Sequence, residues 1–98
     1  TCKEFKRIQE EQYALFCAKN MDYGPGNIAL GTSLEKANQR AASITGVVIR
    51  LADKVNRLLN LVVVNQRSPE NESVMDTFDD ISIYPIIAKI VYNGKWGK

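Results

Sequence analysis

One stretch of this chain decides its fold, ITGVVIRLADKVNRLLNLV at residues 44–62. Its apolar side chains recur every three or four residues, which is the spacing of one face of an α-helix. Upstream, Thr32 and Glu35 stand at the positions of a helix N-cap and its capping-box partner. The sequence therefore predicts a long helix over about 33–64, with an apolar stripe formed by Ile44, Val47, Val48, Leu51, Val55, Leu58, Leu59 and Val62.

Two further helices are predicted on either side of this stretch. Residues 2–19 place apolar side chains at near-helical spacing, and the Gly-, Pro- and Asn-containing segment 20–27 predicts a loop. After the long helix, Ser68 and Pro69 form an N-cap followed by a proline at the first helical position. We expect that helix to continue through Pro85 to Tyr92 and to end at Asn93-Gly94. The fold class is thus all-α, a bundle of about three to four helices.

Length and composition exclude several classes of protein. The chain has 98 residues, 45% of them hydrophobic, and a net charge of +2. This length predicts one domain over residues 1–98 with a thin core, so we expect a partner subunit. No apolar run is long enough for a membrane span, and the small charge gives no reason to expect nucleic-acid binding. Without histidine the chain holds no Ser-His-Asp triad and no His-ligated zinc. Two free cysteines are typical of a reducing, cytoplasmic location.

Polar side chains on the two longer helices are candidates for function. The side of the long helix opposite the apolar stripe carries Arg50, Asp53 and Arg57. This side is either a solvated face or a ligand groove, in which Asp53 would bind a metal and the arginines would bind phosphate oxygens. Glu72, Asp76 and Asp80 follow one another at four-residue spacing with Asp79 beside them. That face is either simply hydrated or a site for a divalent cation such as Mg²⁺.

The predicted loop 20–27 and the residue before it carry a third set of candidates. Lys19, Tyr23 and Asn27 combine a cation, an aromatic ring and an amide. Such groups would stack on and hydrogen-bond a base; the alternative is a turn whose tyrosine ring packs on the core. Trp96, close to the C-terminus, is expected to anchor the tail or a subunit contact.

Three motifs in order resemble one known family. They are KNMDYG at 19–24, GVVIRLADKVNRL at 46–58 and NESVMDTFDDI at 71–81. Together they resemble the phage and bacterial nucleotide modification associated domain 1, which is grouped with the MazG-like all-α nucleoside triphosphate pyrophosphohydrolases. The resemblance covers roughly residues 5–92.

The resemblance implies a MazG-like helical bundle that forms a homodimer or homotetramer in the cytoplasm, the host's if the chain is phage-encoded. It implies Mg²⁺ or Mn²⁺ as cofactor and a (deoxy)nucleoside triphosphate as substrate, cleaved at the α-phosphorus to a monophosphate and pyrophosphate. The implied catalytic and metal-binding residues are Asp53, Glu72 and Asp76, with Asp80 as a further metal ligand. The implied phosphate ligands are Lys19, Arg50, Lys54 and Arg57, and the implied base contacts are Tyr23 and Asn27.

This chain departs from the broader MazG-like pattern in the middle motif. Where those enzymes carry an E-E-x-x-E run, two acids are replaced by Lys54 and Arg57. Three hypotheses follow. The first is a metal-dependent pyrophosphohydrolase of phage nucleotide metabolism. The second is a module that captures a nucleotide without hydrolysing it, which the two cations favour. The third is a structural oligomerisation domain without a ligand.

Overall fold

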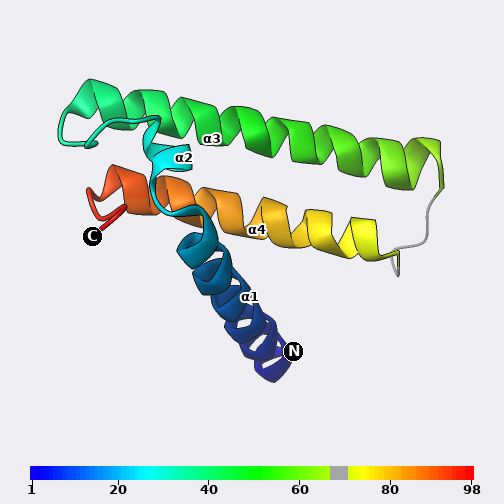
Figure 1. Cartoon of the computed structure of the whole chain (residues 1–98). Helices are drawn as coiled ribbons and strands as arrows, with labels where there is room; N and C mark the ends of the chain where they lie inside the picture. The colour runs from blue at the N-terminus through cyan, green and yellow to red at the C-terminus, as the bar shows by residue number, and fades with distance from the viewer. Residues whose placement is uncertain (67–70) are drawn as a thin grey trace.

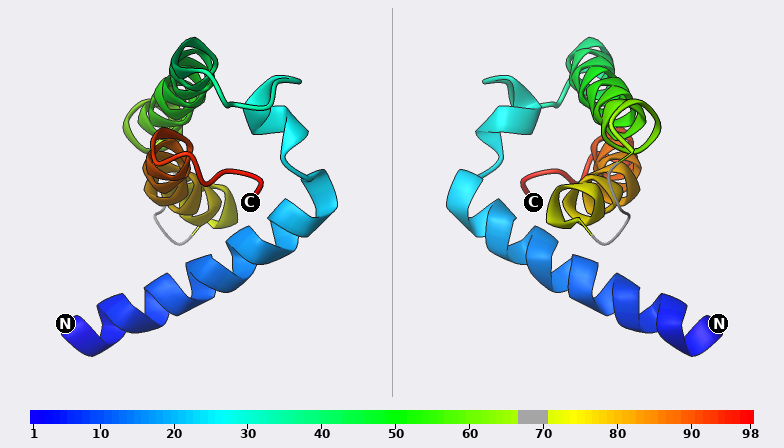
Figure 2. Two further views of the ribbon diagram at one scale, coloured as in Figure 1. Left: turned by 90° about the vertical axis from the view of Figure 1, so that its left-hand side faces the viewer. Right: turned by 90° about the vertical axis from the view of Figure 1, so that its right-hand side faces the viewer.

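Helices are the regular secondary structure of the residues that the computed structural model describes, 1–66 and 71–98, and these residues contain no strand. Helix α1 (Cys2–Tyr23) leads through the short α2 (Gly26–Ala29) into α3 (Ala37–Leu58), which continues as the π-helix η1 (Leu59–Val64); α4 (Glu72–Tyr92) follows. Helices α3 and α4 lie side by side and antiparallel, while α1 diverges from them (Figures 1 and 2). The predicted all-α class is confirmed. In the same ranges no helix is long and apolar enough to cross a membrane.

The apolar stripe of α3 is only partly covered. Val47 is buried, and Ile44, Leu51, Leu58 and Val62 are half-buried. By contrast, Val48 is 54% exposed, and Val55 and Leu59 are also exposed. The prediction of one buried stripe was therefore wrong for these three residues, because among the described residues α4 and the short α2 are the helices that pack on α3, and they leave this side uncovered.

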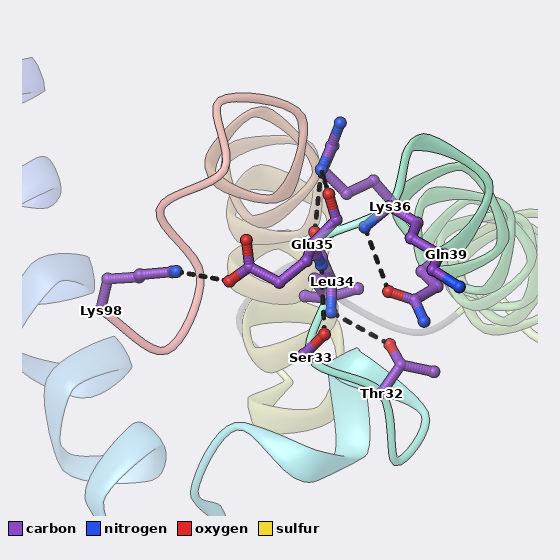
Figure 3. A network of polar contacts seen from close by, with 8 residues as sticks. Thr32, Ser33, Leu34, Glu35, Lys36, Gln39 and Lys98 are labelled. Carbon is purple, nitrogen blue, oxygen red and sulfur yellow. Dashed lines mark hydrogen bonds and ion pairs between the residues drawn. The ribbon is translucent and has the colours of Figure 1, made fainter.

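Helix α3 begins four residues later than predicted, and the capping box at Thr32 was wrong. Lys36 is the N-cap, and its backbone N–H donates to Gln39 Oε1 at 3.2 Å (Figure 3). Thr32 Oγ1 instead accepts from the backbone N–H of Leu34 at 3.3 Å. Leu34 has a left-handed backbone, φ 60°, and a buried side chain. Burial of Leu34 in the core therefore outweighs the local capping signal.

Helix α1 is longer than predicted, and the segment expected to be a loop is largely helical. Residues 20–23 continue α1, which closes with the N–H of Gly24 donating to Asn20 O at 2.9 Å. Gly24 has φ 68°, a conformation that favours glycine. The chain then turns at Pro25 and forms α2, so the predicted loop shrinks to Gly24-Pro25 before the next helix.

The structure confirms that α4 passes through Pro85 and ends before Asn93. The described helix begins after Asn71, whose side chain accepts from the backbone N–H of Ser73 at 2.9 Å. The predicted start at Ser68 and Pro69 lies outside the described residues. Pro85 is exposed and has no N–H, so the carbonyl of Ile81, which is half-buried, lacks its usual helical donor.

The core is small and lies where α2 and the C-terminal tail meet α3 and α4. Its buried members are Ile28, Ala29, Leu34, Val47, Ile87, Val91 and Trp96. Ser43 belongs to this region although it is polar, because its Oγ donates to the carbonyl oxygen of Ile28 at 2.7 Å. This bond joins α3 to α2 and fixes the helix that carries Asn27.

Replacing Ser43 with alanine is expected to lower the free energy of unfolding by about 1–3 kcal/mol, because it leaves the buried Ile28 carbonyl without its donor. Urea unfolding measures the change. Thr45→Ala is the matched control: Thr45 is exposed, its hydroxyl bonds within its own helix to Ala41 O, and we expect a change below about 0.5 kcal/mol. Equal effects of the two variants would contradict the role given to Ser43.

Candidate functional site

A cavity of about 330 Å³ lies among all four α-helices and the C-terminal tail. The end of α1, the turn before α2, the middle of α3 and the second half of α4 all contribute to it. A volume of this size is at the lower end of the range for small-molecule sites. Its lining residues are Phe16, Lys19, Asn20, Tyr23, Gly24, Asn27, Ile28, Arg50, Lys54, Asp80, Ile83, Tyr84, Ile87 and Trp96.

Three cations and one carboxylate give the cavity its charge. Lys54 Nζ lies 3.0 Å from Asp80 Oδ2, and Lys19 Nζ lies 3.9 Å from Asp80 Oδ1. Arg50 Nη2 donates to the carbonyl oxygen of Asn27 at 3.2 Å, an acceptor without charge. With three positive groups against one negative group, the side chains lining the cavity carry a net charge of +2. The arrangement favours an anionic ligand.

Aromatic rings surround these charges. Tyr23 is exposed at the end of α1, whereas Tyr84 and Phe16 are half-buried. Trp96 is buried, makes an edge-to-face contact with Phe16 at 6.1 Å between ring centroids, and donates from Nε1 to Pro25 O at 3.1 Å. The prediction that Trp96 anchors the tail is confirmed. A planar ligand would find ring faces beside the cationic groups.

The structure brings together six of the ten residues proposed from the sequence and leaves four outside the cavity. Lys19, Tyr23, Asn27, Arg50, Lys54 and Asp80 line it, while Asp53, Arg57, Glu72 and Asp76 are exposed and do not. At about 100° per residue, Asp53 points about 100° away from Lys54, whereas Arg57 shares the direction of Arg50 but lies two turns farther along α3, beyond the cavity. Asp76 precedes Asp80 by about one turn and Glu72 by about two turns, toward the other end of α4.

Sequence reasoning missed Tyr84 and the cavity position of Trp96. Tyr84 follows Asp80 by four residues, so the helical spacing alone would have placed it on the same face. Trp96 had no such signal, because its contacts with Phe16 and Pro25 join segments that are far apart in the sequence.

Of the four carboxylates that the resemblance implies as metal ligands, Asp53, Glu72, Asp76 and Asp80, only Asp80 lines the cavity in one chain. Mg²⁺ needs carboxylate oxygens that are free to coordinate it, but Asp80 is paired with Lys54 and approached by Lys19. Within residues 1–66 and 71–98 no three carboxylate or thiol side chains lie close enough to hold a metal ion. The Mg²⁺ or Mn²⁺ cofactor therefore stays a prediction.

The C-terminal tail is fastened on the side of the cavity formed by Trp96. Lys98 Nζ forms an ion pair with Glu35 Oε1 at 2.9 Å (Figure 3). The hydrogen bond from Lys98 and its positive charge lower the pKa of Glu35 below its usual value. Both groups are exposed, so this pair adds little stability and chiefly marks where the tail returns to the segment before α3.

Comparison of the chain with known protein families, with curated proteins and with solved structures gave no significant match. The resemblance of its three motifs to nucleotide modification associated domain 1 therefore stays a prediction, and the case for a function rests on the cavity.

Proposed function

We propose that the cavity binds a nucleoside triphosphate, with its phosphates on Lys19, Arg50 and Lys54 and its base against the rings of Tyr23 and Tyr84. The observation that carries the proposal is the group of three cations around a single carboxylate, next to aromatic side chains. Lysine and arginine are common ligands of phosphate oxygens, and aromatic faces stack on bases. The geometry supports capture of the nucleotide best, the second of the three hypotheses.

In this proposal Asp80 acts as a placeholder for phosphate. It holds Lys54, and more loosely Lys19, inside the cavity while no anion is bound. An incoming phosphate would compete with Asp80 for both ammonium groups. Asp80 is half-buried, so the competition takes place where solvent screens charge less than at the surface.

Hydrolysis of the nucleotide to a monophosphate and pyrophosphate is the second candidate. Its support is the three-motif resemblance together with the spacing of Glu72, Asp76 and Asp80 on one face of α4. In a single chain only Asp80 of these lines the cavity. The homodimer or homotetramer and the cytoplasmic location implied by the resemblance belong to the same proposal.

Calorimetric titration of a panel of nucleoside triphosphates and deoxynucleoside triphosphates, first with a chelator and then with Mg²⁺ or Mn²⁺, tests the function. Capture predicts binding of at least one nucleotide in the chelator and no products afterwards. Pyrophosphate and monophosphate formed with metal would instead support the hydrolase. No binding in either condition would reject both and leave the third hypothesis, a structural helical domain.

Asp80→Asn is expected to tighten nucleotide binding in chelator by about fivefold, because removing the carboxylate frees Lys54 and Lys19 at a gain of about 1 kcal/mol. Asp76→Asn is the matched control, since Asp76 is exposed and outside the cavity, and we expect no change. If Asp80 were a metal ligand, Asp80→Asn would instead abolish metal-dependent turnover. Weaker binding by Asp80→Asn in chelator would contradict the placeholder role.

A further inference from the structure

An apolar groove of about 400 Å³ lies between α1 and α4, apart from the charged groups of the cavity. Helix α4 contributes four isoleucines to it, and α1 contributes two glutamines and two aromatic residues. Ile86 is one of these isoleucines, and its side chain is 52% exposed. The lining residues are Gln9, Gln12, Tyr13, Phe16, Ile83, Ile86, Ile87 and Ile90.

Among the described residues, little packs on the first half of α1. Residues 1–11 are all exposed, and no residue of the whole helix is fully buried. Phe5, which is 64% exposed, and Ile8 share a face with Gln12, one of the groove residues. A helical segment this short is marginally stable in water by itself. We therefore expect the apolar face of this half of α1 to pack against a second surface.

The size of the exposed surface also indicates a missing partner. The chain exposes 7170 Å², against about 5,600 Å² expected for a monomer of 11.0 kDa. Its radius of gyration is 14.9 Å, against about 13 Å for a compact domain of this length. The surplus of about 1,500 Å² exceeds the roughly 800 Å² that each partner buries in a standard stable interface.

We propose that a second copy of this chain fills the groove, so that the first half of α1 of each copy lies in the groove of the other. Phe5 and Ile8 of one copy then pack on Ile83 and Ile86 of the other. A two-fold contact of this kind is self-complementary and closes at two chains. The inference rests on the homodimer of the proposed function and names its interface, although nothing in that interface depends on nucleotide binding.

The charges along α1 suit this exchange. The first turns carry Lys3, Lys6 and Arg7 with one acid, Glu4, a net side-chain charge of +2, and the following turn carries Glu10 and Glu11. Arg7 also pairs with Glu4 and Glu11 of its own helix. A two-fold axis across the helix makes the two α1 helices antiparallel. The basic turns of one copy therefore lie opposite the acidic turns of the other, which favours this pairing over a parallel one.

Sedimentation velocity of the full chain and three variants, at low and high micromolar concentration, tests the proposal. Ile86→Glu charges the groove, and Phe5→Ser removes the ring that enters it. Both positions are exposed in one chain, so both variants should keep the fold, which far-ultraviolet circular dichroism checks. Val48→Glu is the matched control, because Val48 is similarly exposed but lies on α3 outside the groove.

We expect the unaltered chain and Val48→Glu to sediment with the mass of two chains, and Ile86→Glu and Phe5→Ser with the mass of one. A chain that is monomeric at both concentrations would overturn the proposal. Dissociation by Val48→Glu alone would also overturn it and would move the interface to the exposed stripe of α3. An oligomer that survives both groove variants would overturn it as well. Nucleotide titration of the monomeric variants keeps this test separate from that of the cavity.

Discussion

Trp96→Ala is expected to lower the free energy of unfolding by about 3–5 kcal/mol, the largest stability effect that we predict for a single substitution. Trp96 is 8% exposed, contacts the ring of Phe16 and donates a hydrogen bond to Pro25 O. Since the core is small, this loss is a large part of the 5–15 kcal/mol typical of a domain. The melting temperature should fall by more than about 12 °C.

Trp96→Phe is the matched variant for this experiment. It keeps an aromatic ring against Phe16 but removes the N–H that bonds to Pro25 O, so we expect a loss of about 1–3 kcal/mol, smaller than that of the alanine variant. Chemical unfolding followed by circular dichroism measures both. A loss below about 1 kcal/mol for Trp96→Ala would contradict the place given to the tail in the core.

Lys54→Met should weaken nucleotide binding by about 10- to 100-fold, the largest effect that we predict on affinity. A charge-assisted hydrogen bond to phosphate contributes about 1.5–3 kcal/mol, and methionine keeps most of the side-chain volume. The same loss is expected for Arg50→Met, because Arg50 lines the cavity from the preceding turn of α3. Calorimetric titration in chelator measures the dissociation constants.

Arg57→Met is the matched control for the two cavity variants. Arg57 lies on the same helix, carries the same charge as Arg50 and is exposed outside the cavity. We expect the dissociation constant of the nucleotide from this variant to differ less than about threefold from that of the unaltered chain, which is the effect of one distant surface charge. If Arg57→Met weakened binding as much as Lys54→Met, the phosphates would lie farther along α3, near Arg57, rather than in the cavity.

The sequence predicts the helices well because periodicity is a local property. The long helix ends at Val64, at the predicted position, and α4 continues through Pro85. The errors concern boundaries that tertiary contacts decide. Leu34 is drawn into the core, so α3 begins at Ala37 rather than directly after Thr32. Similarly, the glycines after Tyr23 suggested a loop, although α2 is docked there by Ser43.

The site is predicted in part for a related reason. Lys19, Arg50 and Asp80 come from three separate motifs and do meet in one cavity. Helical spacing alone also grouped Arg50 with Asp53. A helix face spans a wide angle, however, and the position of the neighbouring helices decides which residues of that face line a cavity. The sequence offered no comparable rule for Trp96, which reaches the site through the returning tail.

The proposal that the cavity binds a nucleotide is tested most directly by the fluorescence of Trp96 during titration with nucleoside triphosphates in chelator. Trp96 is the single tryptophan of the chain and lines the cavity, so a bound base or phosphate changes its surroundings. We predict a saturable change with at least one nucleotide, shifted to at least tenfold higher concentration in Lys54→Met and retained in Arg57→Met. No change with any nucleotide, or an unshifted curve in Lys54→Met, would contradict the account.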